Sequence, residues 1–278
     1  MEITLWIGLG IIIIGCLVEY IDSTLGMGYG TALTPILLMM GFEPMQVVPA
    51  ILVAELFTGL LAGVMHAKVG NVEFKVRTLN PKRIYESIKS RGFRSTFTNG
   101  ISLHLKIALL ISLFSAIGAV TGSVVAINLP AFYLKLYIGV LILSMGIYIL
   151  VTYNKKFKFT WSKLTAISIV ASFNKSVSGG GYGPVVTGGQ ILAGVDAKNA
   201  IAITSVSESL TCFVGIIAYL ISGVSIDWIL VPYLLIGGLL SIPFSALSVK
   251  KIKTGHFKAM IGFATIVLGS FTLYKLFM

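Results

Sequence analysis

The sequence predicts an all-α, polytopic integral membrane protein of about ten transmembrane segments, arranged as two inverted-topology repeats with broken half-helices at glycine-rich turns. Three observations support this prediction. The 278 residues are 56% hydrophobic and 11% charged, with a mean hydropathy of +0.95, and this composition excludes a soluble domain. Long apolar runs recur along the chain, and the two halves align with each other at a constant shift.

The apolar runs fix the expected spans, because a helix needs about 20 residues to cross roughly 30 Å of hydrocarbon. Seven runs are long enough: 3–22, 44–66, 103–126, 131–153, 197–222, 227–247 and 257–276. Three more are short and interrupted: 27–41, 162–178 and 184–194. The first run follows the acidic Glu2 and precedes no small-residue cleavage site, so we expect a retained first helix. Scattered glycines within the runs (Gly118, Gly122, Gly139 and Gly146) are typical of close helix packing.

The net charge of +11 is concentrated in three stretches, 68–106, 155–163 and 250–258, which hold seventeen of the 21 Lys and Arg residues. Such clustering follows the positive-inside rule and predicts cytoplasmic loops, with both termini on the opposite side. Attraction to anionic lipid headgroups would be a by-product. We therefore expect a multi-pass protein of the cell membrane, with the lipid bilayer and not a nucleic acid as its partner.

The internal repeat appears when the sequence is shifted by 153 residues without a gap. Ser23–Gly30 (STLGMGYG) then aligns with Ser176–Gly183 (SVSGGGYG), and the register continues through Glu55 with Glu208 to Gly70 with Gly223. The halves are thus predicted to be residues 1–153, which include a basic loop at 67–102, and residues 154–278. Five passes separate equivalent points, and an odd number inverts the second half relative to the first.

The glycine clusters interrupt the helices at membrane depth, where non-helical backbone is tolerated only inside protein or beside water. Glycine permits positive φ, and Pro184 suits the first turn of a new helix. We expect half-helices to begin near Thr31 and Pro184 and to converge on one site, since a helix N-terminus attracts anions. Tight packing is the alternative. The candidate substrate-binding residues are Gly26, Gly28, Tyr29, Gly30, Asn174, Lys175, Ser176, Gly179, Gly180, Gly181, Tyr182 and Gly183.

Ionisable residues inside spans are costly and are functional candidates by default. The sequence places five there: Glu19, Asp22, Glu55, Lys175 and Glu208. Glu55, Glu208 and Asp22 are candidates for coupling, with a proton as the coupling ion, and the alternative for the two glutamates is an interhelical hydrogen bond. Lys175 either pairs with Asp22, its equivalent in the first half, or meets an anionic substrate. A polar stripe beside Glu208 (Thr204, Ser207 and Thr211) is expected to face a cavity.

The residues around both glycine clusters resemble the TauE/SafE family of sulfite and organosulfonate exporters. The resemblance rests on LGMGYGTALTPILLMMGFEPMQVVPAILV and Ala67–Val72 in the first half, and on the GGGYG cluster, Ala200–Ser205 and Gly223–Trp228 in the second. It covers most of the chain except the 72–102 loop. The resemblance implies an inverted-repeat exporter of small sulfur-containing anions, such as sulfite or sulfoacetate.

Together these patterns predict a secondary transporter that works by alternating access, and the rival interpretation is an anion channel on the same fold. No enzyme is expected, because no nucleophile–base arrangement is visible. The three histidines (His66, His104 and His256) lack metal-ligand spacing and are expected to anchor span ends at the interface. We expect no metal and no cofactor, and the sequence makes no prediction about the oligomeric state.

Overall fold

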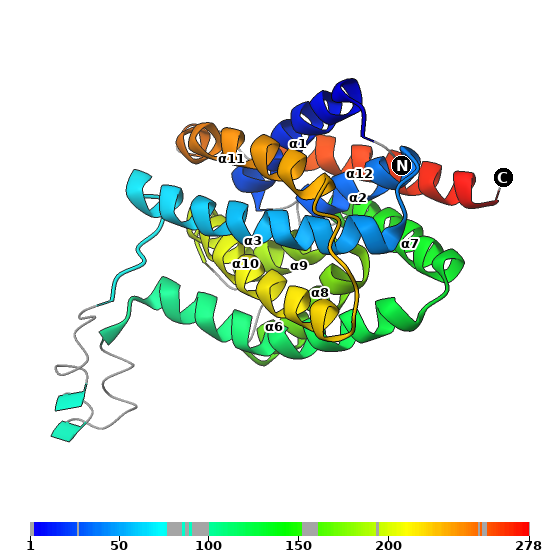
Figure 1. Cartoon of the computed structure of the whole chain (residues 1–278). Coiled ribbons are helices and arrows are strands. Elements are labelled where there is room, and N and C mark those ends of the chain that lie inside the picture. The colour runs from blue at the N-terminus through cyan, green and yellow to red at the C-terminus, as the bar shows by residue number, and fades with distance from the viewer. Residues whose placement is uncertain are drawn as a thin grey trace.

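The computed structural model describes residues 3–26, 28–76, 85–86, 89–90, 100–151, 161–192, 195–249, 251 and 255–277. In these ranges the chain forms ten helices of eleven or more residues, arranged as a bundle (Figure 1). They are α1 (Leu5–Leu25), α2 (Tyr29–Met39), α3 (Pro44–Val69), α6 (Leu103–Asn128), α7 (Ala131–Val151), α8 (Trp161–Ser178), α9 (Tyr182–Leu192), α10 (Ala197–Ile221), α11 (Leu230–Ser248) and α12 (Gly255–Phe277). The predicted all-α class is confirmed for the described residues.

Six of these helices are long and apolar enough to cross a membrane: α1, α3, α6, residues Ala131–Tyr148 of α7, α10 and α11. All six coincide with predicted spans. Helix α8 carries buried polar residues from its middle to its end: Ser168, Ser172, Asn174, Lys175, Ser176 and Ser178. Helix α2 and the apolar part of α12, Ile266–Phe277, are shorter. The protein is therefore a multi-pass membrane protein.

Helices α3 and α10 form the centre of the bundle. They pack against each other, and α11 and α6 pack against α3 and α10 respectively. In the most apolar 18-residue windows, 67% of α3 and 72% of α10 is buried, against 28% of α1. Helix α1 pairs with α11, α6 with α8, and α7 with α12. Short helices α2 and α9 fill the interior between these pairs, so their ends lie among other helices.

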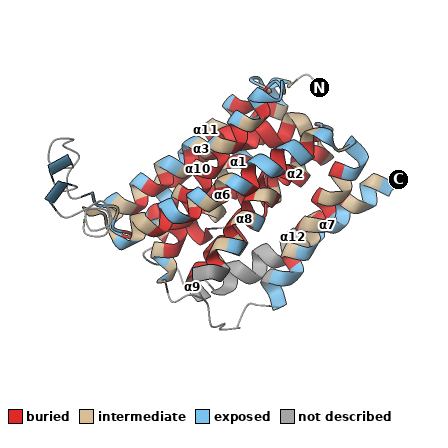
Figure 2. Ribbon diagram, turned by 90° about the horizontal axis from the view of Figure 1, so that it is seen from below, coloured by how far each residue is buried: buried red, intermediate tan, exposed pale blue. Residues whose placement is uncertain are grey.

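The outer surface of the bundle is apolar, as a lipid-facing surface requires. Figure 2 shows buried residues gathered between the helices and exposed residues on their outward faces. Large apolar side chains are exposed on the surface of the bundle, including Trp6, Leu113 and Phe244. Because the bilayer core offers no hydrogen bonds, an apolar outer face and internally satisfied helices are the arrangement expected in lipid.

Both termini lie at one end of the bundle, whereas α3 ends and α6 begins at the other end (Figures 1 and 2). There Val76 and Ile101 form an isolated antiparallel bridge that closes the base of the expected basic loop. Most of that loop, like most of the two other basic stretches, lies outside the described residues. The side of the membrane that each of these ends occupies stays a prediction.

Local signals explain where the helices around the site begin and end. The hydroxyl of Thr4 caps α1, and the Asp196 carboxylate caps α10 by accepting a bond of 3.0 Å from the Lys198 N–H. Pro44 occupies the first turn of α3, where its missing N–H costs nothing. Gly70 ends α3 with a φ of 83°, in the left-handed region that favours glycine. These signals fix both ends of α3 and the starts of α1 and α10.

Glycines allow close contact between paired helices, as predicted for Gly118, Gly122 and Gly139. A Cβ on Gly118 would lie 2.8 Å from the Phe173 nitrogen of α8, and one on Gly122 would lie 2.5 Å from the Phe173 carbonyl oxygen. A Cβ on Gly139 would lie 2.7 Å from a Leu273 methyl group of α12. Small residues thus bring α6 against α8 and α7 against α12.

Candidate functional site

Two turns divide adjacent helices at equivalent places. Helix α1 ends at Leu25 and α2 begins at Tyr29, while α8 ends at Ser178 and α9 begins at Tyr182. Each turn contains two glycines of positive φ: Gly26 (69°) and Gly28 (135°) in the first, Gly179 (74°) and Gly181 (81°) in the second. Residues with a Cβ rarely adopt this conformation, so the turns require glycine.

The two turns lie directly against each other. A Cβ on Gly180 would lie 2.7 Å from the backbone nitrogen of Thr31, and a Cβ on Gly30 would overlap the Gly179 carbonyl oxygen. The Gly181 N–H donates to the Thr31 hydroxyl at 3.0 Å. The two glycine clusters are therefore in contact, and close backbone approach accounts for Gly30 and Gly180. That they form one binding site stays a prediction.

Helix α9 also reaches back to the first turn. The Thr187 hydroxyl donates to the Gly26 carbonyl at 2.8 Å and lies 2.8 Å from the Thr204 hydroxyl, while the Gln190 amide donates to Thr204 at 2.9 Å. The Thr211 hydroxyl, two turns further along the same face of α10, lies 3.4 Å from the Tyr182 hydroxyl. The polar stripe of α10, expected to face a cavity, thus contacts α9.

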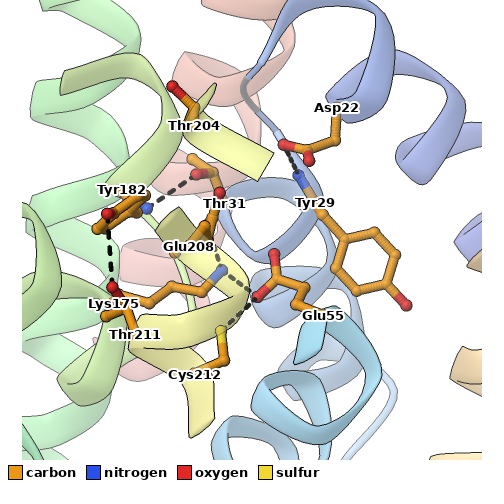
Figure 3. Close-up of polar contacts among 12 residues, drawn as sticks. Asp22, Tyr29, Thr31, Glu55, Lys175, Tyr182, Thr204, Glu208, Thr211 and Cys212 are labelled. Carbon is orange, nitrogen blue, oxygen red and sulfur yellow. Dashed lines mark hydrogen bonds and ion pairs between the residues drawn. The ribbon is translucent and has the colours of Figure 1, made fainter. Parts of the chain in front are cut away.

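Lys175 is the buried cation of this centre. It lies in the last turn of α8, where its carbonyl accepts a bond from the Gly179 N–H at 2.7 Å, and it is 1% exposed. Its ammonium forms ion pairs with Glu208 of α10, at 2.7 Å, and with Glu55 of α3 (Figure 3). A buried ammonium is tolerated only when it is paired in this way.

The ion pairs of Lys175 differ from the Asp22 pair considered above. Asp22 instead accepts a bond of 3.1 Å from the Tyr29 N–H at the start of α2. The reason is the position of α3 and α10: as central helices they carry Glu55 and Glu208 to the ammonium from two sides. Both glutamates are buried, and one oxygen of Glu55 has no hydrogen-bond partner among the described residues.

Two further buried groups complete the centre. The thiol of Cys212 lies 3.9 Å from a Glu55 carboxylate oxygen (Figure 3). Glu19, one turn before Asp22 on α1, is 2% exposed, and its Oε2 has no hydrogen-bond partner in the part of the chain that the structure describes. Three carboxylates, Asp22, Glu55 and Glu208, interact electrostatically with the Lys175 ammonium, and Glu19 lies in electrostatic range of these three carboxylates. Such an excess of acidic groups at membrane depth is typical of ion-coupling sites.

The other predicted substrate residues are all buried, and several already have protein partners. The Tyr29 hydroxyl donates to the Leu234 carbonyl at 3.2 Å, and the Tyr182 hydroxyl lies 3.2 Å from the Ser115 hydroxyl. The Asn174 amide oxygen accepts a bond from Tyr137. The buried hydroxyl of Ser176 finds no hydrogen-bond partner within the described ranges, and Gly183 lies in the first turn of α9. Substrate contact by these residues stays a prediction.

His66 is a buried residue that the sequence interpretation placed wrongly at the interface. It is 0% exposed, because the turn at Gly70 brings Asn71 back over the end of α3. The ring Nε2 lies 3.0 Å from the Ser23 carbonyl, and Nδ1 lies 3.0 Å from the Asn71 amide. Tyr219, the residue 153 positions later, donates to the Ser176 carbonyl at 2.6 Å. Ser23 and Ser176 correspond at the same shift, so the internal repeat pairs the His66 bond with the Tyr219 bond. This correspondence is the signal in the sequence that points to a buried His66.

Comparison with known proteins assigns the chain to a family. The family model described as "Sulfite exporter TauE/SafE" matches residues 11–79 and 91–272, which is most of the chain. A protein of Bacillus subtilis (strain 168), named "Probable membrane transporter protein YtnM", is 26% identical over 274 residues, covering 94% of this chain and 80% of the relative. No solved structure matches the chain.

Proposed function

Because the chain belongs to the sulfite exporter TauE/SafE family, we propose that it is a secondary transporter that exports a small sulfur-containing anion across the cell membrane. The substrate class we propose is sulfite or an organosulfonate such as sulfoacetate. Transport proceeds by alternating access around the two glycine turns and is coupled to an ion gradient. The family and the relative support a membrane transporter, and the finer assignment rests on the site described above.

Lys175 carries the proposal. A fully buried ammonium at the last turn of α8, directly before the second glycine turn, is a fixed positive charge at membrane depth. Its two ion pairs use carboxylate oxygens, and sulfonate or sulfite oxygens offer an ammonium the same kind of acceptor. A residue of this kind marks a substrate or ion pathway in membrane proteins.

The starts of α2 and α9 supply further anion-binding groups. Each helix has eleven residues, begins at a glycine turn, and directs its first N–H groups toward the turn region. Because these N–H groups lie at the positive end of the helix dipole, they favour a negative charge. With the two turns in contact, both helix starts and Lys175 belong to one region of the protein.

Equivalent features of the two halves, residues 1–153 and 154–278, support rocking of one half against the other. The positive-φ glycines recur at the shift of 153: Gly26 with Gly179, Gly28 with Gly181, and Gly70 with Gly223. The helix pairs correspond as well: α1 with α11 matches α8 with α6, and α3 with α11 matches α10 with α6. Inverted repeats around a midplane site are the usual architecture for alternating access.

The test is uptake of radiolabelled sulfite and sulfoacetate into proteoliposomes containing the purified chain. We expect saturable uptake by the wild type and its loss in Lys175→Met. The matched control is Lys135→Met, which removes a partly exposed lysine that pairs with Glu43. A channel would instead give non-saturating flux and a large conductance in planar bilayers. Equal uptake by wild type and Lys175→Met would contradict the proposal.

A further inference from the structure

The buried centre already contains anions of its own at the proposed substrate position. Two of the three N–H donors of Lys175 face Glu208 and Glu55. The other groups that face these glutamates are Glu19 and Asp22 of α1, Tyr29 of α2, Tyr182 of α9 and Cys212 of α10. Among these described neighbours Lys175 is the one cation, so an arriving anion meets an excess of negative charge.

Charge balance then restricts how a substrate can bind. With both glutamates ionised, Lys175, Glu55 and Glu208 sum to a charge of −1. An added monoanion would make the sum −2 in a low-dielectric interior, where an unbalanced charge is very costly. A proton on one glutamate removes that cost, because it frees an N–H of Lys175 and restores the sum to −1.

We propose that the protein is an electroneutral proton–anion symporter, in which one proton binds for each negative charge on the substrate. This inference rests on the proposed function and adds the coupling ion, the sign of the coupling and the stoichiometry. A proton from water binds a carboxylate oxygen of Glu208 or Glu55, and that carboxylate releases the Lys175 ammonium. The anion then occupies the vacated position. On the other side of the membrane both leave and the ion pair forms again.

This geometry distinguishes symport from antiport. In an antiporter the proton and the anion compete for one site, whereas here the proton neutralises the groups that compete with the anion for Lys175. Proton binding and anion binding therefore favour each other, and by reciprocity the effect is equal in both directions. Net flux follows the product of the two gradients, so export occurs whenever the outward anion gradient exceeds the opposing proton gradient.

The first test is the pH dependence of binding, measured by calorimetry with methanesulfonate, which stays a monoanion from pH 5 to pH 9. One linked proton raises the Kd about tenfold per pH unit where the site is mostly deprotonated. Glu208→Gln and Glu55→Gln imitate the protonated state, so each should bind with a weaker pH dependence. Glu43→Gln, which removes an exposed carboxylate, is the control and should keep the wild-type slope. A wild-type Kd that is constant from pH 5 to pH 9, or that falls as the pH rises, would overturn the inference.

The second test follows protons directly, with a pH-sensitive dye inside sodium-free proteoliposomes to which sulfoacetate is added. Symport predicts that the lumen becomes more acidic as the anion enters, at a rate unchanged when potassium and valinomycin set the membrane potential. Anion uptake without acidification, with alkalinisation, or driven only by a sodium gradient would overturn the coupling and leave the proposed function intact. Absence of any anion uptake would overturn the proposed function and this inference with it.

Discussion

Removing the ammonium of Lys175 tests the energetics of the buried centre. Lys175 is 1% exposed, and its partners Glu55 and Glu208 are 4% and 7% exposed, so Lys175→Met leaves two carboxylates in the interior without their counter-ion. Breaking a buried ion pair costs about 3–5 kcal/mol, because the remaining charge is uncompensated. We expect the free energy of unfolding to fall by about this amount at pH 8.

The loss should depend on pH and on the two glutamates. Without Lys175 the two carboxylates carry uncompensated negative charge in the interior, and a more acidic solution reduces that charge. Stability then rises as the pH falls, so the penalty is smaller at pH 5 than at pH 8. In the triple variant Lys175→Met, Glu55→Gln, Glu208→Gln no charge of the trio remains, and we expect most of the stability to return. Replacing a whole buried ion pair is often neutral.

The assay is denaturant unfolding of the purified protein in detergent, followed by far-UV circular dichroism at pH 5 and pH 8. Lys135→Met serves as the control, since its partly exposed pair with Glu43 is worth about 0–1 kcal/mol. The reasoning is refuted if Lys175→Met is within about 1 kcal/mol of the wild type at pH 8. It is also refuted if the triple variant is as unstable as the single one.

Three further predictions concern the groups around this centre. In the same unfolding assay, Gly180→Ala should lower the free energy of unfolding by about 1–3 kcal/mol or more, because the new Cβ would lie 2.7 Å from backbone atoms of Thr31. Gly10→Ala is the control: no atom lies within 4 Å of the added Cβ, so this change should be neutral or slightly stabilising. Thr187→Val should cost about 1–3 kcal/mol, since it leaves the buried Gly26 carbonyl without its donor, and wild-type unfolding would contradict that assignment. His66→Phe and Tyr219→Phe each remove a hydrogen bond to a buried carbonyl, so each should lower the free energy of unfolding by about 1–3 kcal/mol in thermal unfolding. Wild-type stability of both variants would refute the equivalent roles of the two residues.

Much of the fold could be predicted from the sequence, because the signals are local. Apolar runs of about 20 residues gave the six candidate spans, and positive-φ glycines follow from the GMGYG and GGGYG clusters. The shift of 153 residues also indicated that Glu55 and Glu208 are equivalent, and both form ion pairs with Lys175. The inverted orientation of the halves stays a prediction.

The partners within the site could not be predicted, because they depend on how distant helices pack. Asp22 was a reasonable partner for Lys175 by symmetry, but the depth of α3 and α10 in the bundle gives that place to the two glutamates. His66 stands beside a basic stretch, which indicates an interface, yet Asn71 and the end of α11 cover it. Such long-range contacts have no signature in a local window of sequence.

The most direct test of the account is anion binding to the purified wild type and to Lys175→Met, measured by thermal shift with sulfite, sulfoacetate, taurine, sulfate and acetate. The account predicts stabilisation by sulfite or sulfoacetate that saturates, persists in Lys135→Met and is absent in Lys175→Met. Equal stabilisation of wild type and Lys175→Met, or stabilisation by none of the anions, would contradict an anion site at Lys175.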